Sequence, residues 1–264
     1  MNCFVLYSDY NCEFYKSLRN KRLIYFFNKL NAKQNLSIAW DLSISFLFFS
    51  LSTIQYEDRE KYNGEEKRLD VESANIYGQH EFLKACKDID TLFHLAAING
   101  TENFYRIPAT VLEVGVKGAL NTLEAAVQCG VTNYIVTSSS EVYQEPTHIP
   151  TTEKERIIIP DIHNPRFSYS AGKIINEALV IHWAPEKLKT VICRPHNFYG
   201  PRMGLSHVIP ELMKKVVDTK TGQLDVYSVN HKRTFCYITD ALEMIQLLAE
   251  SDQTIAESYN IGND

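Results

Sequence analysis

The chain has 264 residues, of which 45% are hydrophobic and 22% are charged, and its formal net charge is −5. This composition is typical of one globular α/β domain, or of such a domain with a small substrate-binding lobe. The acidic balance argues against a nucleic-acid interface, which needs clustered Lys and Arg, but one or two arginines suffice for an anionic small molecule.

Residues 1–53 form an atypical N-terminal segment. They are aromatic and basic, contain neither glycine nor proline, and show no clean hydrophobic period. They lack the pattern of a signal peptide, and the apolar run 44–49 is too short to span a membrane. The six cysteines include no C-x-x-C pair, which favours reduced thiols. We therefore expect a cytoplasmic protein without a membrane partner.

From about residue 54 onward, expected strands and helices alternate with good punctuation. The expected strands are 91–97, 134–139, 188–194 and 258–261, and the expected helices are 108–130 with Gly130 as its C-cap, 169–183, and one capped by Asp240 that runs to about 250. This alternation predicts a Rossmann-like, doubly wound parallel sheet with helices on both faces. We assign residues 54–200 to an incomplete cofactor-binding and catalytic domain, and 201–264 to a partial substrate-binding lobe with returning Rossmann elements.

Polar residues gather where the expected strands end. His94 precedes Ala96 and Ala97, the run 138–141 follows the next strand, and His196 with Asn197 follows a third. Ligands bind at the carboxyl ends of the strands in parallel sheets, so these residues are site candidates.

The strongest chemical signal is the pair Tyr169 and Lys173. Residues four apart share one helix face, so the phenol and the ammonium can enter one site. A nearby ammonium favours the phenolate and is expected to lower the pKa of Tyr169, which makes it a general base for an alcohol. A strand-end hydroxyl thirty residues earlier, Ser139, can hydrogen-bond the same substrate oxygen.

Together these motifs resemble the extended short-chain dehydrogenases/reductases, specifically the NAD-dependent epimerase/dehydratase family of nucleotide-sugar enzymes. The matching segments, in family order, are Arg68–Val71, Phe93–Ala97, Ser139 four residues before Tyr143, Tyr169 with Lys173 and Glu177, Arg194–Pro201 and Arg233–Asp240.

The resemblance implies a role for each matching residue. It implies catalysis by Ser139, Tyr169, Lys173 and Glu141; NAD binding by Asp70, Val71, Leu95, Ala96, Ala97, Tyr169, Lys173 and Pro195; and nucleotide-sugar binding by Ser140, Asn197, His207 and Arg233. No metal site is expected, because no cluster has metal-ligand spacing. The family commonly forms homodimers through the helix that bears Tyr169.

The family reaction passes through a 4-keto sugar, and its outcome depends on the residues beside the serine. Ser140 and Glu141 stand where a 4,6-dehydratase usually has Asp and Glu, which disfavours dehydration. The Ser-Ser-Glu pattern is closer to that of nucleotide-sugar decarboxylases and also occurs among epimerases. Epimerase and decarboxylase therefore stay open.

Three features depart from the family pattern. Gly64 is the first glycine of the chain, so no glycine-rich loop for the NAD pyrophosphate precedes it. Gly115 stands where the family usually has an Asn that braces the site, and the sequence stops at Asp264, where relatives continue. We therefore expect weak or absent NAD binding, and a catalytically inactive family remnant is the alternative reading.

Overall fold

The structure is a computed structural model that describes residues 2–8, 23–29, 69–75, 79–201, 203–204, 207–219, 222–227, 229–251 and 256–263. The proposed domain boundary near residue 54 lies outside these residues.

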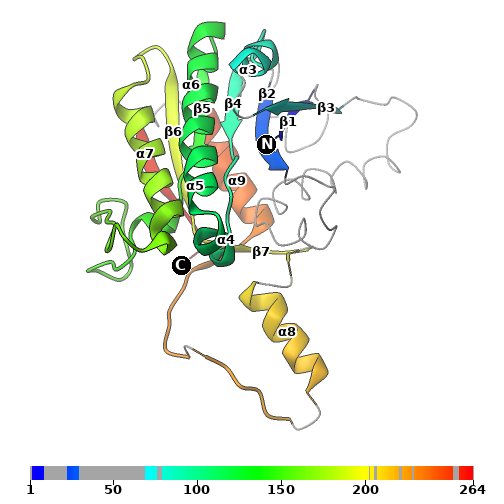
Figure 1. Cartoon of the computed structure of the whole chain (residues 1–264), viewed down its shortest axis with the longest axis vertical. Coiled ribbons are helices and arrows are strands. Elements are labelled where there is room, and N and C mark those ends of the chain that lie inside the picture. Colours follow the sequence, from blue (N-terminus) through cyan, green and yellow to red (C-terminus); the bar gives the residue numbers. More distant parts are fainter. Residues whose placement is uncertain are drawn as a thin grey trace.

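A seven-stranded sheet forms the centre of the molecule, in the order β3-β1-β2-β4-β5-β6-β9 (Figure 1). Its strands are β1 (Asn2–Ser8), β2 (Leu23–Lys29), β3 (Leu69–Asn75), β4 (Thr91–His94), β5 (Asn133–Thr137), β6 (Lys189–Pro195) and β9 (Glu257–Ile261). A separate parallel pair consists of β7 (Asn197–Tyr199) and β8 (Phe235–Tyr237). Strands β2, β4, β5, β6 and β9 pair in parallel, as the alternating pattern predicts.

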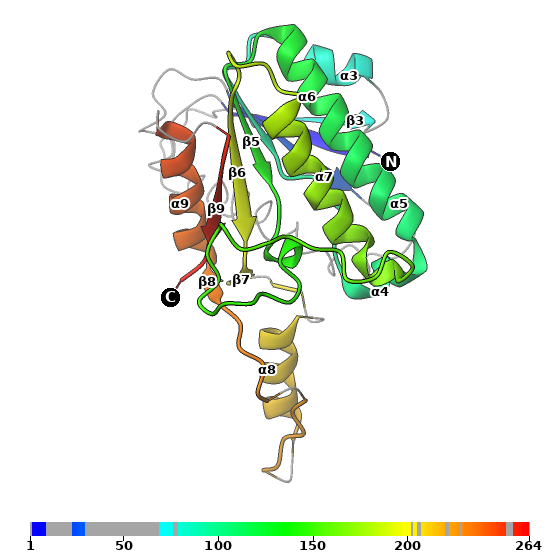
Figure 2. The ribbon, with the colours of Figure 1, turned by 90° about the vertical axis from the view of Figure 1, so that its left-hand side faces the viewer.

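Helices cover both faces of the sheet (Figure 2). The described helices are α3 (Gln79–Ala85), α4 (Thr101–Arg106), α5 (Pro108–Leu112), a π-helix (Glu113–Lys117), α6 (Gly118–Cys129), α7 (Ser168–His182), α8 (Val208–Asp218) and α9 (Ile238–Glu250), with 3₁₀ turns at Ser140–Val142 and Pro165–Phe167. Helices α5, α6 and α7 lie on one face and α9 on the other (Figure 2).

Strand periodicity divides the core between the two faces, because successive side chains of a strand point in opposite directions. In β5, Tyr134 and Val136 belong to the larger apolar cluster, which includes residues of α3, α6 and α7. Ile135 between them packs with Ala241 and Ile245 of α9. The central strands are buried on both faces, which explains their nearly continuous apolar sequences.

The N-terminal segment differs from its expected role. Its strands β1 and β2 lie inside the sheet, where β2 pairs in parallel with β4. Strand β1 runs antiparallel to both β2 and β3, so the sheet is mixed rather than wholly parallel. Aromatic and β-branched residues favour strands, and the sequence 23–29 (LIYFFNK) is rich in them without showing the alternation that identifies a half-buried strand.

Two helix ends test the capping predictions. Gly130 ends α6 in the left-handed conformation at φ 74°, which confirms it as the C-cap. The prediction that Asp240 caps α9 is wrong, since the N-cap is Tyr237 and Asp240 lies in the first turn. An acidic residue in the first turn still favours the helix, because it opposes the positive end of the helix dipole.

Helix α8 extends away from the sheet, below β7 and β8 in Figure 2. None of its residues is buried. No helix among the described residues is both long enough and apolar enough to cross a membrane.

Candidate active site

The carboxyl ends of β4, β5 and β6 bring several expected site residues to one edge of the sheet. Ser138 and Ser139 follow β5 directly, and Leu95, Ala96 and Ala97 follow β4. All of these residues are buried. Pro195, the last residue of β6, pairs with Ile261 at the same edge. This is the edge at which parallel sheets bind ligands.

Tyr169 lies in the first turn of α7 and faces this edge. Its phenol hydrogen-bonds the hydroxyl of Ser139, and its ring stacks on Phe104 with 5.1 Å between the ring centroids. The Lys173 Nζ lies 5.7 Å from the centroid of the Tyr169 ring. The structure thus brings together the serine, the phenol and the amine that the sequence predicts.

The Lys173 amine is hydrogen-bonded to the end of strand β5. Its side chain is buried, and its Nζ donates to the carbonyl oxygen of Thr137 at 2.5 Å. Burial lowers the pKa of Lys173 from 10.5 to about 8, against the opposing effect of Glu177. The amine therefore loses its charge near pH 8, well below the ordinary range of a lysine.

The pKa of Tyr169 is raised, whereas the sequence analysis predicted that it would be lowered. Burial is the main cause that raises it, and the negative charge of Glu141 raises it further, while the hydrogen bond from Ser139 lowers it. The sequence pattern shows the neighbouring ammonium but neither the depth of the phenol nor the position of Glu141, which explains the error.

Glu141 is bound by an arginine that the sequence analysis missed. Arg166, in the 3₁₀ turn before α7, donates from Nη1 and Nη2 to the two carboxylate oxygens of Glu141 at 2.8 and 2.9 Å. The same guanidinium lies over the ring of Phe104, 5.2 Å from its centroid. No local pattern in the sequence signals this contact, because Glu141 and Arg166 lie 25 residues apart in the chain.

A buried polar network lies beneath the site. The Arg194 guanidinium donates to both oxygens of Glu177, at 2.9 Å from Nε and 2.6 Å from Nη2. Glu177 also accepts from the Ser138 hydroxyl. Arg194 donates to the Tyr143 hydroxyl at 2.8 Å, and Tyr143 donates to Asn260 at 2.8 Å. The network therefore ties α7 to the ends of β5, β6 and β9.

His94 lies in the core beside these groups. Its Nδ1 is 3.3 Å from the Thr122 hydroxyl, which is also 2.8 Å from the hydroxyl of Tyr134, and its Nε2 has no partner among the described residues. Burial, helped by the charge of Lys173, lowers the pKa of His94 to about 3. A neutral imidazole therefore packs next to the lysine.

Gly115, the departure from the family pattern, lies in the π-helix opposite α7. An ideal Cβ on Gly115 would be 4.0 Å from the Gly172 Cα, so the two backbones approach closely. The buried amide of Asn176, oriented to satisfy its surroundings, donates to the carbonyl oxygens of Gly115 and Gly172 at 3.1 Å each. Asn176 of α7 thus hydrogen-bonds the π-helix at Gly115, the position where the family usually has an asparagine.

Two expected cofactor residues lie at the opposite edge of the sheet. The pairing register places Asp70 level with Tyr7, Ile24 and Leu92, at the amino end of β4. Val71 lies one residue further along β3. The structure does not bring this pair to the edge that holds Tyr169.

Three of the expected substrate residues lie near β7 and β8, and the fourth, Ser140, lies after β5. Asn197 donates from Nδ2 to the carbonyl oxygen of Thr234 at 3.0 Å, so its amide is engaged within the β7–β8 pair. Arg233 is exposed and donates to the carbonyl oxygen of Lys232. His207 is the N-cap of α8, and Ser140 is half-buried beside Ser139.

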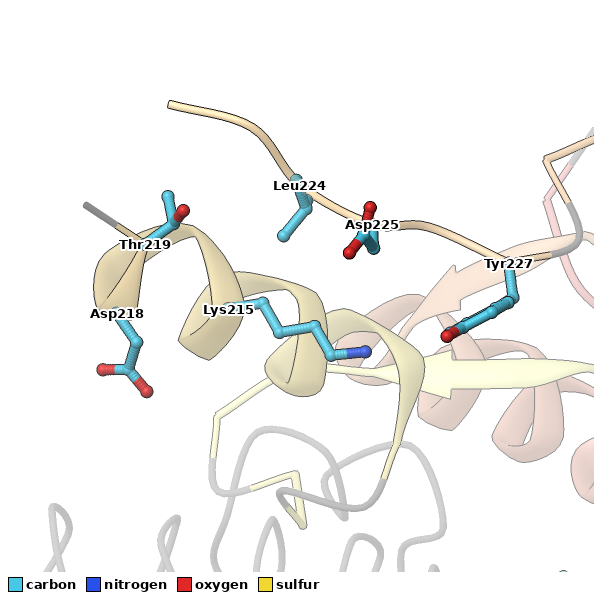
Figure 3. Close-up of a pocket in the computed structure, with 6 residues that line it drawn as sticks. All are labelled: Lys215, Asp218, Thr219, Leu224, Asp225 and Tyr227. Atoms are coloured by element: carbon cyan, nitrogen blue, oxygen red, sulfur yellow. The ribbon is translucent and has the colours of Figure 1, made fainter. Parts of the chain in front are cut away.

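A hollow of about 410 Å³ lies elsewhere, between the end of α8 and the segment that follows it (Figure 3). Its lining residues are Lys215, Asp218, Thr219, Leu224, Asp225 and Tyr227. None of the expected site residues lines it, and α8 extends away from the sheet, so we do not assign the chemistry to this hollow.

A comparison with known families decides the classification. Residues 52–262 match the model of the NAD dependent epimerase/dehydratase family. The chain belongs to this family. The match covers the sheet from β3 onward together with Tyr169 and Lys173, and it confirms the resemblance inferred from the motifs.

Two curated relatives and two solved structures illustrate the similarity. The chain is 28% identical to UDP-N-acetyl-alpha-D-glucosaminuronate decarboxylase of Bacillus cytotoxicus, over 79% of this chain and 65% of the relative. It is 32% identical to UDP-glucuronic acid decarboxylase 6 of Arabidopsis thaliana, over 67% of this chain and 51% of the relative. The chain thus spans between half and two thirds of the length of these relatives.

The fold is shared with a dTDP-glucose 4,6-dehydratase double mutant from Streptomyces venezuelae, solved with NAD bound, at TM-score 0.61 and 22% identity over 72% of this chain and 56% of that one. It is also shared with UDP-glucose 4-epimerase of Thermotoga maritima, at TM-score 0.61 and 24% identity over 72% of this chain and 61% of that one. These likenesses confirm the Rossmann-like fold.

The family name implies NAD, and the residues of this chain fit one end of it. Lys173 and Tyr169 lie at the carboxyl edge of the sheet, where the small, buried Ala96 and Ala97 follow β4, which suits a nicotinamide ribose. At the other end the fit fails, because a pyrophosphate cradle needs glycines after the first strand and the chain has none before Gly64.

Proposed function

We propose that this chain carries the catalytic centre of an oxidoreductase that acts on a nucleotide sugar and forms a 4-keto sugar. The supporting observation is the convergence of the Tyr169 phenol, the Ser139 hydroxyl and the Lys173 amine at the carboxyl edge of the sheet. We assign Ser139, Tyr169 and Lys173 as catalytic residues, and Leu95, Ala96, Ala97 and Pro195 as the wall against which the nicotinamide binds.

The chemistry assigns a separate task to each side chain. Tyr169 Oη removes the proton of the sugar C4 hydroxyl, and the Ser139 hydroxyl holds the same oxygen. Lys173, in its ammonium form, favours the phenolate, and it gains that form as pH falls below about 8. When bound, NAD supplies the hydride acceptor.

The outcome after oxidation depends on Glu141 and its neighbours. We propose an epimerase-type reaction, with Ser140, Asn197, His207 and Arg233 as the residues that contact the nucleotide sugar. A decarboxylase is the second candidate, because the two relatives above are decarboxylases at 28% and 32% identity. Reaction of the purified chain with UDP-glucose and with UDP-glucuronic acid, followed by NMR of the sugar products, separates the two reactions.

Substitution of the proposed base tests the proposal. We expect Tyr169→Phe to lower the rate of NADH formation in a single turnover by about 100-fold or more, since positioned acid–base catalysis contributes about 10²–10⁴-fold. Absorbance at 340 nm measures this rate, and circular dichroism checks that the variant is folded. A variant as active as the wild type would contradict the role of Tyr169.

Binding and turnover assays on the wild-type chain separate an active enzyme from a catalytically inactive family remnant. Binding of the nucleotide sugar without any turnover would favour a catalytically inactive family remnant, for which the missing glycine loop is the physical reason.

We also propose that a second copy of this chain packs on α7. Ile175 and Ile181 are exposed on this helix at 41% and 42%, although Lys173 and Glu177 on the same helix are buried. Size-exclusion chromatography of an Ile175→Glu variant tests the homodimer, since a charge on this surface is expected to give the monomer.

A further inference from the structure

Glu141 and Arg166 form an ion pair at the edge of the catalytic centre, between two 3₁₀ turns that both pack against α7. Glu141 lies on the 3₁₀ turn that begins after Ser139, and Arg166 lies on the turn that leads into α7. Their side chains are 34% and 26% exposed, and two hydrogen bonds of 2.8 and 2.9 Å join them. This forked geometry is the strongest that an arginine makes with a carboxylate.

Phe104 connects the same arginine to the phenol. The Arg166 guanidinium lies 5.2 Å from the centroid of the Phe104 ring, and that ring stacks on Tyr169 at 5.1 Å and an interplanar angle of 16°. Phe104 is 1% exposed, so it is fixed by the core. Arg166 therefore contacts both the carboxylate whose charge acts on Tyr169 and the ring that stacks on Tyr169.

The charges around Tyr169 oppose one another. Glu141 raises the pKa of the phenol, Ser139 lowers it through a hydrogen bond, and the Lys173 amine lies near the ring. Arg166 faces Glu141, and the hydrogen bonds and charge of that carboxylate raise the pKa of the guanidinium. Arg166 is the cation that directly binds the carboxylate opposing the phenolate.

We propose that Arg166 is a positioning residue that compensates the charge of Glu141 and thereby sets how readily Tyr169 acts as a base. This inference deepens the proposed function, because it concerns the same phenol, and it adds a residue pair whose charges determine the pH range of the reaction. Loss of Arg166 leaves the Glu141 charge uncompensated, which disfavours the phenolate. Loss of the Glu141 charge has the opposite effect.

A titration of residue 169 tests the proposal without requiring turnover. Tyr169 is replaced by 3,5-difluorotyrosine, whose phenol is more acidic than that of tyrosine and titrates while the protein stays folded, and its ionisation is followed by ¹⁹F NMR. We expect Arg166→Gln to raise the titration midpoint by about one pH unit and Glu141→Gln to lower it by about one unit. The double variant is expected to titrate close to the chain with both residues intact.

Two controls separate charge from structure. Arg166→Lys keeps the cation and loses the fork, so the midpoint should stay within a few tenths of a unit even if the melting temperature falls. Arg106→Gln removes the same charge from an exposed pair with Glu102 on the helix that carries Phe104, and should leave the midpoint unchanged.

Midpoints that move in the same direction in Arg166→Gln and Glu141→Gln, or that do not move in either, would overturn the proposal. If the midpoint rises in Arg166→Gln and falls in Glu141→Gln, but the chain shows no turnover, only the proposed function is contradicted. The two outcomes are therefore distinguishable.

Discussion

The amine of Lys173 is buried in the folded chain, and its burial has a measurable effect on the free energy of unfolding. Its pKa is about 8 in the folded chain, because burial disfavours the ammonium, whereas a lysine in an unfolded chain titrates near ~10.4. Between these values the unfolded state binds a proton that the native state has released. The free energy of unfolding therefore rises with pH in this window, and below it the burial penalty is fully present.

We expect this pH dependence to disappear in Lys173→Met. Relative to that variant, the free energy of unfolding of the wild type should increase by about 2 kcal/mol between a pH of about 7.5 and one of about 9.5. Urea denaturation at each pH measures it. Lys187→Met, at an exposed position just before β6, is the matched control and should run parallel to the wild type. A parallel curve for Lys173→Met would show that the amine is not titrating there.

Single residues of the site were predictable where a short-range pattern carries them. The four-residue spacing of Tyr169 and Lys173 predicts that they share a helix face. The position of Ser139 after an apolar run, together with the family resemblance, predicts that the serine joins them. Arg166 and Phe104 meet Glu141 and Tyr169 only because α4, the 3₁₀ turns and α7 pack together. No local period signals such contacts, and the direction of the Tyr169 pKa depends on them.

At the scale of elements, the buried pair of Glu177 and Arg194 holds α7 against β6. The two side chains are 3% and 6% exposed, and the same network reaches the Ser138 hydroxyl and Tyr143. Removal of one partner leaves a buried charge without compensation. We therefore expect Arg194→Met to lower the free energy of unfolding by about 3–5 kcal/mol.

The double variant Arg194→Met with Glu177→Leu should lose less stability than the sum of the two single variants, because no lone charge stays buried. Chemical denaturation measures all three. Arg106→Met breaks an exposed pair whose side chains are 71% and 75% exposed, and should cost less than about 1 kcal/mol. Additive single effects would mean that the pair is not coupled.

The outer boundaries of the elements that were expected from β4 onward were predictable to within about three residues, because the residues that end a helix or strand act locally. Helices α4 and α8 and strands β7 and β8 were not among the expected elements. Gly130 needs its left-handed conformation to end α6, and a hydroxyl follows β5 where the strand enters a turn. Strands β1 and β2 were not predictable, since their place beside β4 depends on pairing between residues far apart in the sequence. The division of the chain into domains at 54 and 200 stays a prediction.

At the scale of the whole molecule, the chain offers matching residues to the nicotinamide end of NAD but not to its pyrophosphate end. The nicotinamide end has a matching set in Tyr169, Lys173 and the small residues after β4. The pyrophosphate end would need backbone N–H groups of a glycine-rich turn and the N-terminus of the following helix. Residues 1–63 contain no glycine, and β1 is paired antiparallel with β2 rather than through a parallel crossover.

This imbalance predicts how the purified chain binds fragments of NAD. Without the pyrophosphate cradle, the adenosine half adds little, so NAD and nicotinamide mononucleotide should bind with dissociation constants within about tenfold, a difference of about 1.4 kcal/mol. Isothermal titration calorimetry measures both, and Lys173→Met should weaken both equally because it removes a group at the shared end. NAD that binds about a thousandfold more tightly than the mononucleotide, or that co-purifies at full occupancy, would require a phosphate site that uses other residues than glycines.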